Sequence, residues 1–179
     1  MSIFKFAAAV GVCGALMMAG TNVARGEASG EKSGAYKVTI HVDRVDSLHL
    51  EALVELVNPA AIAALTLPLQ WGNGRSAYRL DSADYHGLRT DYFALKTFRV
   101  DSTKQTVLIG LISDLGGNYP PLEPGDGGIA RLHFSSKRPV NTALAIDTTF
   151  IPPHNVLQLV TPDVRAIRPT FHSSMKPKP

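Results

Sequence analysis

The sequence predicts an all-β protein, an antiparallel β-sandwich of about nine strands. Apolar and polar residues alternate with a period of two along most of the chain, as they do in half-buried strands. Clusters of Gly, Pro, Asn and Asp separate these segments at intervals of about 8–15 residues. No segment has the 3.6-residue period of an amphipathic helix, so a parallel sheet built from strand–helix–strand units is not expected.

The first 26 residues are predicted to be a cleaved signal peptide. Lys5 supplies a positive charge, and the uncharged apolar run AAAVGVCGALMM follows it. Either Ala24-Arg25-Gly26 or Gly26-Glu27-Ala28 then fits a small-x-small cleavage site. The alternative is a transmembrane anchor, but the run is too short because a span needs about 20 apolar residues. We therefore expect an exported protein, periplasmic or extracellular, that is not inserted in a membrane after cleavage.

The chain beyond residue 26 has nearly balanced charge and no cysteine. The full sequence has 18 basic and 15 acidic residues. Two of the basic residues, Lys5 and Arg25, lie in the signal peptide, so the mature chain has a net charge of +1. This balance does not predict a basic patch, and nucleic acid is not an expected partner. The only cysteine, Cys13, is removed with the signal peptide, which excludes a disulfide or a thiol nucleophile.

The folded domain is predicted to span residues 35–171. A flexible polar leader, 27–34, precedes it, and a disordered basic tail, 172–179, follows it. Lys37–Val42 and Leu48–Leu56 alternate strictly and predict the first two strands. The second of these is also rich in Glu, Ala and Leu, which favour helix, but its period of two favours a strand.

The third strand, Ala61–Trp71, follows a turn signal and places its leucines and Trp71 on one face. Pro68 cannot donate to a ladder, so we predict that this strand lies at a sheet edge or contains a bulge. Gln105–Ile112 is apolar on both faces and is therefore predicted to be a central strand covered on both sides. The other predicted strands are Tyr78–Leu80, Phe93–Val100, Gly128–Ser135, Leu144–Phe150, Val156–Val160 and Val164–Phe171.

No catalytic motif is present, and neither a cofactor nor a metal is expected. The chain lacks a G-x-S-x-G nucleophile motif, H-E-x-x-H, a P-loop and a dinucleotide-binding glycine pattern. His41, His49 and His133 fall on outward strand positions, and solvent exposure is favoured there over metal ligation, which needs three or four converging ligands. A calcium site at Asp114 and Asp126 is a further alternative, but ordinary turn residues are favoured because the acidic spacing is sparse.

Five aromatic residues offer an alternative function, the binding of carbohydrate by stacking. They are Trp71, Tyr78, Tyr85, Tyr92 and Tyr119. A carbohydrate-binding module needs such rings on its surface. Trp71, however, shares its strand face with three leucines, so core packing is favoured for that ring.

The order of several motifs resembles the cohesin-like modules of secreted bacterial proteins. The segment LEALVELVNP, ending near Asn58, matches a valine-rich strand closed by Asn. Leu67–Trp71 loosely matches an F-x-L-x-Y-D strand, with Trp71-Gly72 in place of Tyr-Asp. Gly128–Phe134, GIARLHF, matches a late G-x-[IL]-A-x-[IL]-x-F strand. The resemblance covers roughly residues 35–171 and implies a nine-stranded jelly-roll sandwich.

The resemblance also implies a non-catalytic module that binds another secreted protein. In that family the usual partner is a dockerin, a small calcium-binding module, often in carbohydrate-degrading assemblies. Loops as long as residues 113–127 are often functional in compact domains, and this one has no core role visible in the sequence. We therefore predict a partner-binding loop that contains Asp114, Asn118, Tyr119, Glu123 and Asp126.

Overall fold

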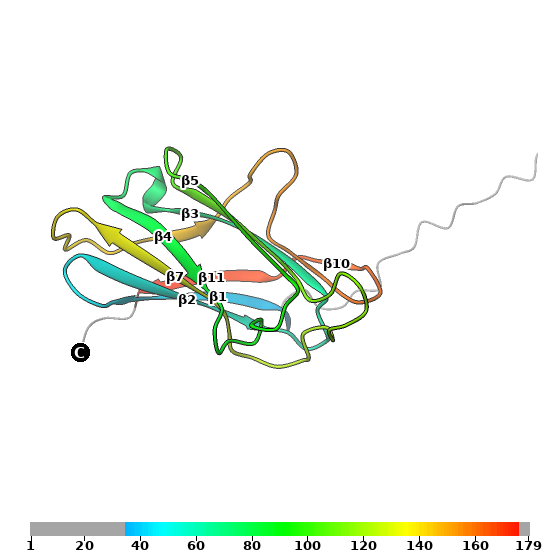
Figure 1. The fold of residues 1–179 in the computed structure, drawn as a ribbon. Helices are drawn as coiled ribbons and strands as arrows, with labels where there is room; N and C mark the ends of the chain where they lie inside the picture. Colours follow the sequence, from blue (N-terminus) through cyan, green and yellow to red (C-terminus); the bar gives the residue numbers. More distant parts are fainter. Residues whose placement is uncertain (1–34, 176–179) are drawn as a thin grey trace, which may run out of the picture.

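The computed structural model describes residues 35–175, which form two β-sheets that pack face to face (Figure 1). The first sheet has the order β11-β1-β2-β7-β4 and is called the β2 sheet below. Its strands are β1 (Lys37–Arg44), β2 (His49–Val57), β4 (Tyr78–Asp84), β7 (Gly128–Ser136) and β11 (Thr170–Met175). The predicted signal peptide and the leader 27–34 lie outside the described residues.

The second sheet has the order β10-β9-β3-β6-β5, with β8 also paired to β3, and is called the β3 sheet below. Its strands are β3 (Ala64–Trp71), β5 (Leu95–Asp101), β6 (Thr106–Ile112), β8 (Ile146–Thr148), β9 (Gln158–Val160) and β10 (Ala166–Ile167). A short 3-10 turn, η2 (Gly72–Gly74), follows β3. The predicted β-sandwich is confirmed. In the described part of the chain, no helix is long and apolar enough to span a membrane.

The core lies between the two sheets and is built by the predicted alternation. Val38, Ile40 and Val42 of β1 are fully buried, whereas the residues between them are at least partly exposed. Trp71 is 1% exposed and packs edge-on against Phe134 at 5.8 Å between ring centroids, so its ring joins the two sheets. Its indole N–H donates to the carbonyl of Tyr78 at 2.9 Å. The favoured prediction of a core position for Trp71 is confirmed.

The C-terminal strand differs from the prediction in its direction and its length. β11 pairs with β1 in parallel, from Lys37 opposite Thr170 to Val42 opposite Met175, while the other ladders are antiparallel. The strand therefore includes residues 172–175, which the sequence predicts to be part of the disordered tail. The mostly polar composition of this segment does not predict a strand. It joins the sheet because it pairs with β1.

Pro68 does not lie on an edge strand, and that prediction is wrong. β3 has β6 on one side and both β8 and β9 on the other. β9 pairs with residues up to Thr66 and β8 with residues from Leu69, so Pro68 faces the junction between these two short strands. Its carbonyl accepts from the N–H of Thr149 at 3.1 Å. The missing N–H of Pro68 therefore coincides with a break in the ladder, which makes proline compatible with an interior strand.

β6 is central, as predicted, but only one of its faces is covered. Val107, Ile109 and Leu111 point into the core, at 1% exposure or less. Leu108 and Ile112 point the other way and are only half-buried. The prediction of burial on both faces is wrong, because no layer of the described structure packs over the outside of the β3 sheet.

Candidate partner-binding site

The second half of the 113–127 loop is attached to the core, contrary to the sequence prediction. Leu122 is 3% exposed and exchanges two backbone hydrogen bonds with Ile62, at 2.9 and 2.8 Å. Gly125 exchanges two with Asn58, both at 2.9 Å. The loop thus pairs with the connection between β2 and β3. The sequence hides this pairing because Leu122 is a single apolar residue among prolines, glycines and acids.

Arg89, from the connection between β4 and β5, holds the same segment from outside. Its guanidinium donates to the carbonyl of Leu56 at 2.9 Å, to Asn58 Oδ1 at 3.0 Å and to the carbonyl of Glu123 at 2.7 Å. Burial lowers the pKa of Arg89, and the nearby charge of Asp126 opposes this shift. The chain passes close to this side chain with φ of +151° at Gly125 and +132° at Gly127, values that favour glycine. Glu123 and Asp126 therefore lie on a clamped segment.

The first half of the loop is a turn organised by Asp114. Its carboxylate accepts from the backbone N–H groups of Gly116 at 3.1 Å, Asn118 at 3.0 Å and Gly117. These hydrogen bonds lower the pKa of Asp114. The carboxylate oxygens thus face backbone donors, as the turn interpretation predicts, rather than a free space for calcium. Within residues 35–175 there is no group of three or more His, Cys, Asp or Glu side chains that could hold a metal ion.

The aromatic residues that were considered for sugar stacking do not form one platform. Trp71 and Tyr78 are 1% and 2% exposed, so they cannot contact a sugar. Tyr85 is partly buried, and burial raises the pKa of its hydroxyl to about 12. Tyr92 and Tyr119 are exposed, at 37% and 48%. The hydroxyl of Tyr92 donates to the carbonyl of Pro121 at 3.1 Å, which places this ring beside the loop.

The outer face of the β3 sheet is a second candidate site, which the sequence analysis missed. Half-buried Leu108 and Ile112 of β6 project from it. The register places Pro68, which is itself buried, beside Leu108, and Leu95 of β5 beside Ile112. Between the two β6 residues, Thr97 lies over Gly110 and donates to its carbonyl at 3.2 Å. A Cβ at Gly110 would be 2.6 Å from Thr97 Oγ1, so glycine keeps this part of the face flat.

A shallow groove of about 180 Å³ continues this face toward the β8–β9 connection. Leu108 lies in it, and Phe150, at 57% exposure, lines its other side. Arg99 and Lys104 line the groove together with Asp101, whose Oδ2 lies 3.9 Å from Lys104 Nζ. An exposed aromatic ring beside aliphatic side chains and flanking charges is the composition of a protein-binding surface. The sequence signal for this second candidate site is the run VLIGLI, because a strand that is apolar on both faces is covered on its second face either by another layer or by a partner.

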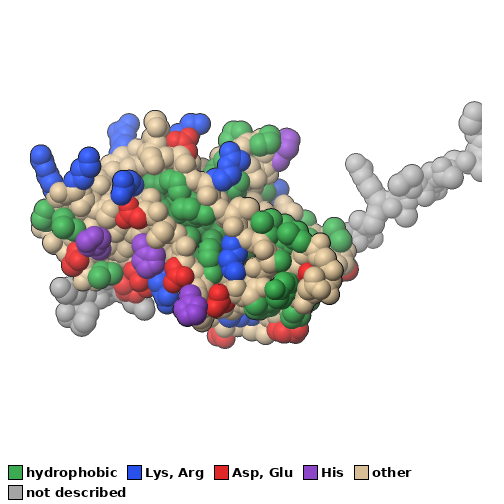
Figure 2. Space-filling model, in the orientation of Figure 1, with side chains coloured by type: hydrophobic (Ala, Val, Ile, Leu, Met, Phe, Trp, Pro, Cys, Tyr) green, Lys and Arg blue, Asp and Glu red, His purple; other side chains and the backbone are tan. Residues whose placement is uncertain are grey.

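The outer face of the β2 sheet is polar and internally paired. Arg131 Nε lies 2.9 Å from Glu51 Oε1, and its Nη1 lies 3.6 Å from Asp84 Oδ2. His41 Nε2 lies 3.1 Å from Glu55 Oε2. Figure 2 shows histidine, acidic and basic side chains interspersed over the region of β2 and β7. The predicted outward positions of His41, His49 and His133 are confirmed. Each lies beside a different acidic residue, so the three rings do not converge. His41 pairs with Glu55, His49 pairs with Asp46, and His133 Nδ1 lies 3.9 Å from Glu51.

No protein-family model and no curated protein matches this chain. Solved structures do match. A cohesin in a type I cohesin–dockerin complex from Clostridium thermocellum has a TM-score of 0.61 at 9% identity, covering 80% of this chain and 100% of that chain. The sixth cohesin of scaffoldin B from Acetivibrio cellulolyticus, in complex with a Cel5 dockerin variant, has a TM-score of 0.59 at 12% identity, covering 80% and 99%. The fold is cohesin-like.

The same fold also occurs in a non-cellulosomal cohesin from the archaeon Archaeoglobus fulgidus, with a TM-score of 0.50 at 14% identity over 78% of this chain and 89% of that chain. The cohesin-like resemblance found in the sequence is thus supported by the arrangement of both sheets. Identities of 9–14% make the likeness one of fold. Because fold alone does not determine function, the function of this protein is inferred from the residues on its surface.

Proposed function

We propose that this protein is an exported, non-catalytic module that binds another secreted protein in the manner of a cohesin binding a dockerin. The uncovered apolar face of the β3 sheet carries the proposal. A half-buried leucine, a half-buried isoleucine and an exposed phenylalanine remain in contact with water there. Covering them with a partner would remove apolar surface from water at roughly 25 cal/mol per Å². The dockerin complexes formed by cohesins of the same fold support this class of partner.

In this proposal the predicted loop lies at the border of this face. β6 ends at Ile112, and the loop begins with the next residue. In this proposal Asp114, Asn118 and Tyr119 make secondary contacts from the Asp114 turn. Glu123 and Asp126 contribute charge from the segment that Arg89 clamps. The sheet face supplies the affinity and the loop supplies selectivity, because apolar anchors dominate binding energy and rim charges mainly direct association.

A test uses leucine substitutions on the two outer faces. Leu108→Asp places a charge at the centre of the β3-sheet face, and Leu53→Asp places the same charge among the outward residues of β2, where Leu53 is also half-buried. We expect dockerin-bearing proteins of the same organism's secreted fraction to bind the wild type and Leu53→Asp. Binding to Leu108→Asp should fall by about 100-fold or more. Calorimetry with the purified partner measures this difference.

Equal loss in both variants, or none in Leu108→Asp, would exclude the β3-sheet face. The loop is tested separately by replacing residues 115–119 with a short Gly-Ser linker, which leaves Leu122 and its core contacts in place. We expect a smaller loss of affinity, about three- to tenfold. Unchanged affinity would remove the loop from the site while leaving the sheet face intact.

Carbohydrate binding is the alternative function, and it is supported by two exposed tyrosine rings on which a sugar could stack. Tyr92 and Tyr119 both lie at the 113–127 loop. Glycan-array binding that is lost in both Tyr92→Ala and Tyr119→Ala would support it. Trp71→Ala is not a useful variant for this purpose because the ring is in the core.

A further inference from the structure

The basic side chains of this protein are not spread evenly. Figure 2 shows Lys and Arg side chains gathered at one end of the sandwich, over η2 and the start of the β7–β8 connection. A shallow depression of about 350 Å³ lies at this end. It is lined by Ala77, Arg79, Ser135, Ser136, Lys137 and Arg138, so each charged residue in it is basic. The near-zero net charge expected for the mature chain does not predict this cluster, because a sum of charges does not show how they are distributed.

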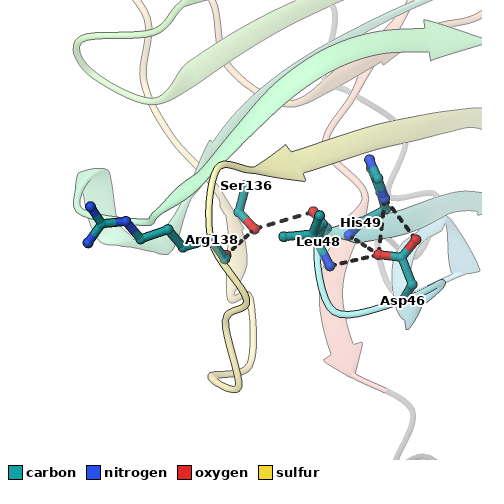
Figure 3. A network of polar contacts seen from close by, with 5 residues as sticks. All are labelled: Asp46, Leu48, His49, Ser136 and Arg138. Atoms are coloured by element: carbon teal, nitrogen blue, oxygen red, sulfur yellow. Dashed lines mark hydrogen bonds and ion pairs between the residues drawn. The ribbon is translucent and has the colours of Figure 1, made fainter.

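The depression is formed where β4 and β7 pair. Arg79 lies opposite Ser135 in the register, and Lys137 and Arg138 follow directly after β7. The Ser136 hydroxyl lies 2.8 Å from the carbonyl of Arg138, which bends the chain at this point (Figure 3). The Arg138 side chain extends away from that hydroxyl (Figure 3), and the residue is exposed.

The β7–β8 connection is held further along at Val140. The backbone N–H of Val140 donates to the carbonyl of Ser47 at 3.2 Å. Its carbonyl accepts from the guanidinium of Arg44 and, at 3.3 Å, from the hydroxyl of Tyr78. Arg44 therefore fixes the loop, whereas Lys137 and Arg138 of the depression remain available.

Acidic residues do not neutralise Lys137 or Arg138. Within residues 35–175, neither has an acidic partner in an ion pair. Asp46, on the neighbouring turn, accepts from the N–H groups of Leu48 and His49 and pairs with the His49 ring (Figure 3). Arg79 pairs with Asp81 at 2.8 Å but is 71% exposed. The depression thus carries an uncompensated charge of about +2.

We propose that this depression binds an anionic polysaccharide through the carboxylate or sulfate groups of its sugars. Ala77 is the only apolar residue in the lining, so an anchor of the kind that protein partners need is missing there. The ring of Tyr78, which pairs with Ser136 in the ladder, is 2% exposed and cannot stack on a nucleobase. Exposed Lys and Arg side chains with serine hydroxyls fit charged, hydroxyl-bearing sugars spread along a polymer. The site is separate from the β3-sheet face.

The test measures binding of the purified protein to polygalacturonate, dextran sulfate and poly-glutamate by biolayer interferometry at low and high salt. We expect binding to one of the two polysaccharides that weakens with added salt. Lys137→Glu/Arg138→Glu should weaken it by about two- to thirtyfold, because two exposed charge pairs of ordinary strength are lost. The matched control is Lys37→Glu, an exposed cation at the opposite end of the β2 sheet, which should retain nearly full affinity.

Polygalacturonate and dextran sulfate distinguish carboxylate from sulfate as the recognised group. Binding to poly-glutamate alone would overturn the proposal in favour of an acidic protein segment. Absence of binding to all three polymers would overturn it, as would equal losses in Lys37→Glu and the double variant. Ser136 is left unchanged because its hydroxyl shapes the loop, and an unchanged thermal midpoint shows that the double variant is folded.

Discussion

The outer faces of the two sheets differ although their inner faces are alike. Both inner faces alternate into one shared core. Outside, the β2 sheet has ion pairs that satisfy one another, such as Arg131 with Glu51. The β3 sheet instead exposes aliphatic residues, a flat glycine site and Phe150. The polar groups of the β2-sheet face therefore satisfy one another, whereas the β3-sheet face leaves apolar surface whose burial would be stabilising.

The largest expected effect tests whether the outside of β6 is a free surface. Ile109→Ala removes a fully buried side chain and should lower the free energy of unfolding by about 2–5 kcal/mol. Leu108→Ala, one residue earlier on the outer face, should cost less than about 1 kcal/mol because the side chain is already half-hydrated. Urea denaturation measures both. Similar losses would show that the outer face is packed and would remove the contrast between the two sheets.

A smaller effect tests the flat site at Gly110. Gly110→Ala brings a Cβ to 2.6 Å from Thr97 Oγ1, and the β-branched Thr97 has little freedom to move. The variant should lose about 1–3 kcal/mol of unfolding free energy. In Thr97→Ala/Gly110→Ala the clash is absent, so a double-mutant cycle should show a coupling of about 1 kcal/mol. Additive losses would mean that the close approach of Thr97 is not the reason why glycine is required at position 110.

The polar face should respond weakly to the loss of an ion pair. Arg131→Met removes the contacts to Glu51 and Asp84, but Arg131 is 31% exposed, so the loss should be about 0.2–1 kcal/mol. Because salt screens such pairs, the difference from wild type should shrink at about 1 M salt. A loss above about 3 kcal/mol that is independent of salt would identify this network as part of the core instead.

The smallest effect is local and depends on pH. Backbone hydrogen bonds lower the pKa of Asp114 below its ordinary value of 3.8. The carboxylate therefore stabilises the folded turn above that value, and this contribution is lost as the pH falls through the lowered pKa. The protection of the Gly116–Asn118 amides, measured by NMR as exchange relative to the intrinsic rate at each pH, should fall below about pH 4 in wild type. In Asp114→Asn this protection should be low at neutral pH too, and protection in wild type that does not change with pH would contradict this assignment.

Parts of the fold follow from local patterns, and other parts depend on distant contacts. The alternation of Lys37–Val42 predicts a strand because it needs only one buried face. The places where prediction failed each involve a distant partner. Pro68 lies in an interior strand because the strands on one side of it end there, and Leu122 is buried because Ile62 lies opposite. The sequence predicts burial of the outer face of β6 wrongly, because apolar composition alone does not show whether a layer covers it.

The sequence by itself determined the fold class, the alternation that makes the core, and the turn formed by Asp114. Each of these rests on the chemistry of neighbouring residues. Tertiary structure alone decided which apolar face remains open, which loop residues Arg89 clamps, and that Arg79 of β4 meets the basic residues after β7 at one end. These features arise between segments far apart in the chain, and neither the net charge nor a local hydrophobic pattern carries information about which segments meet.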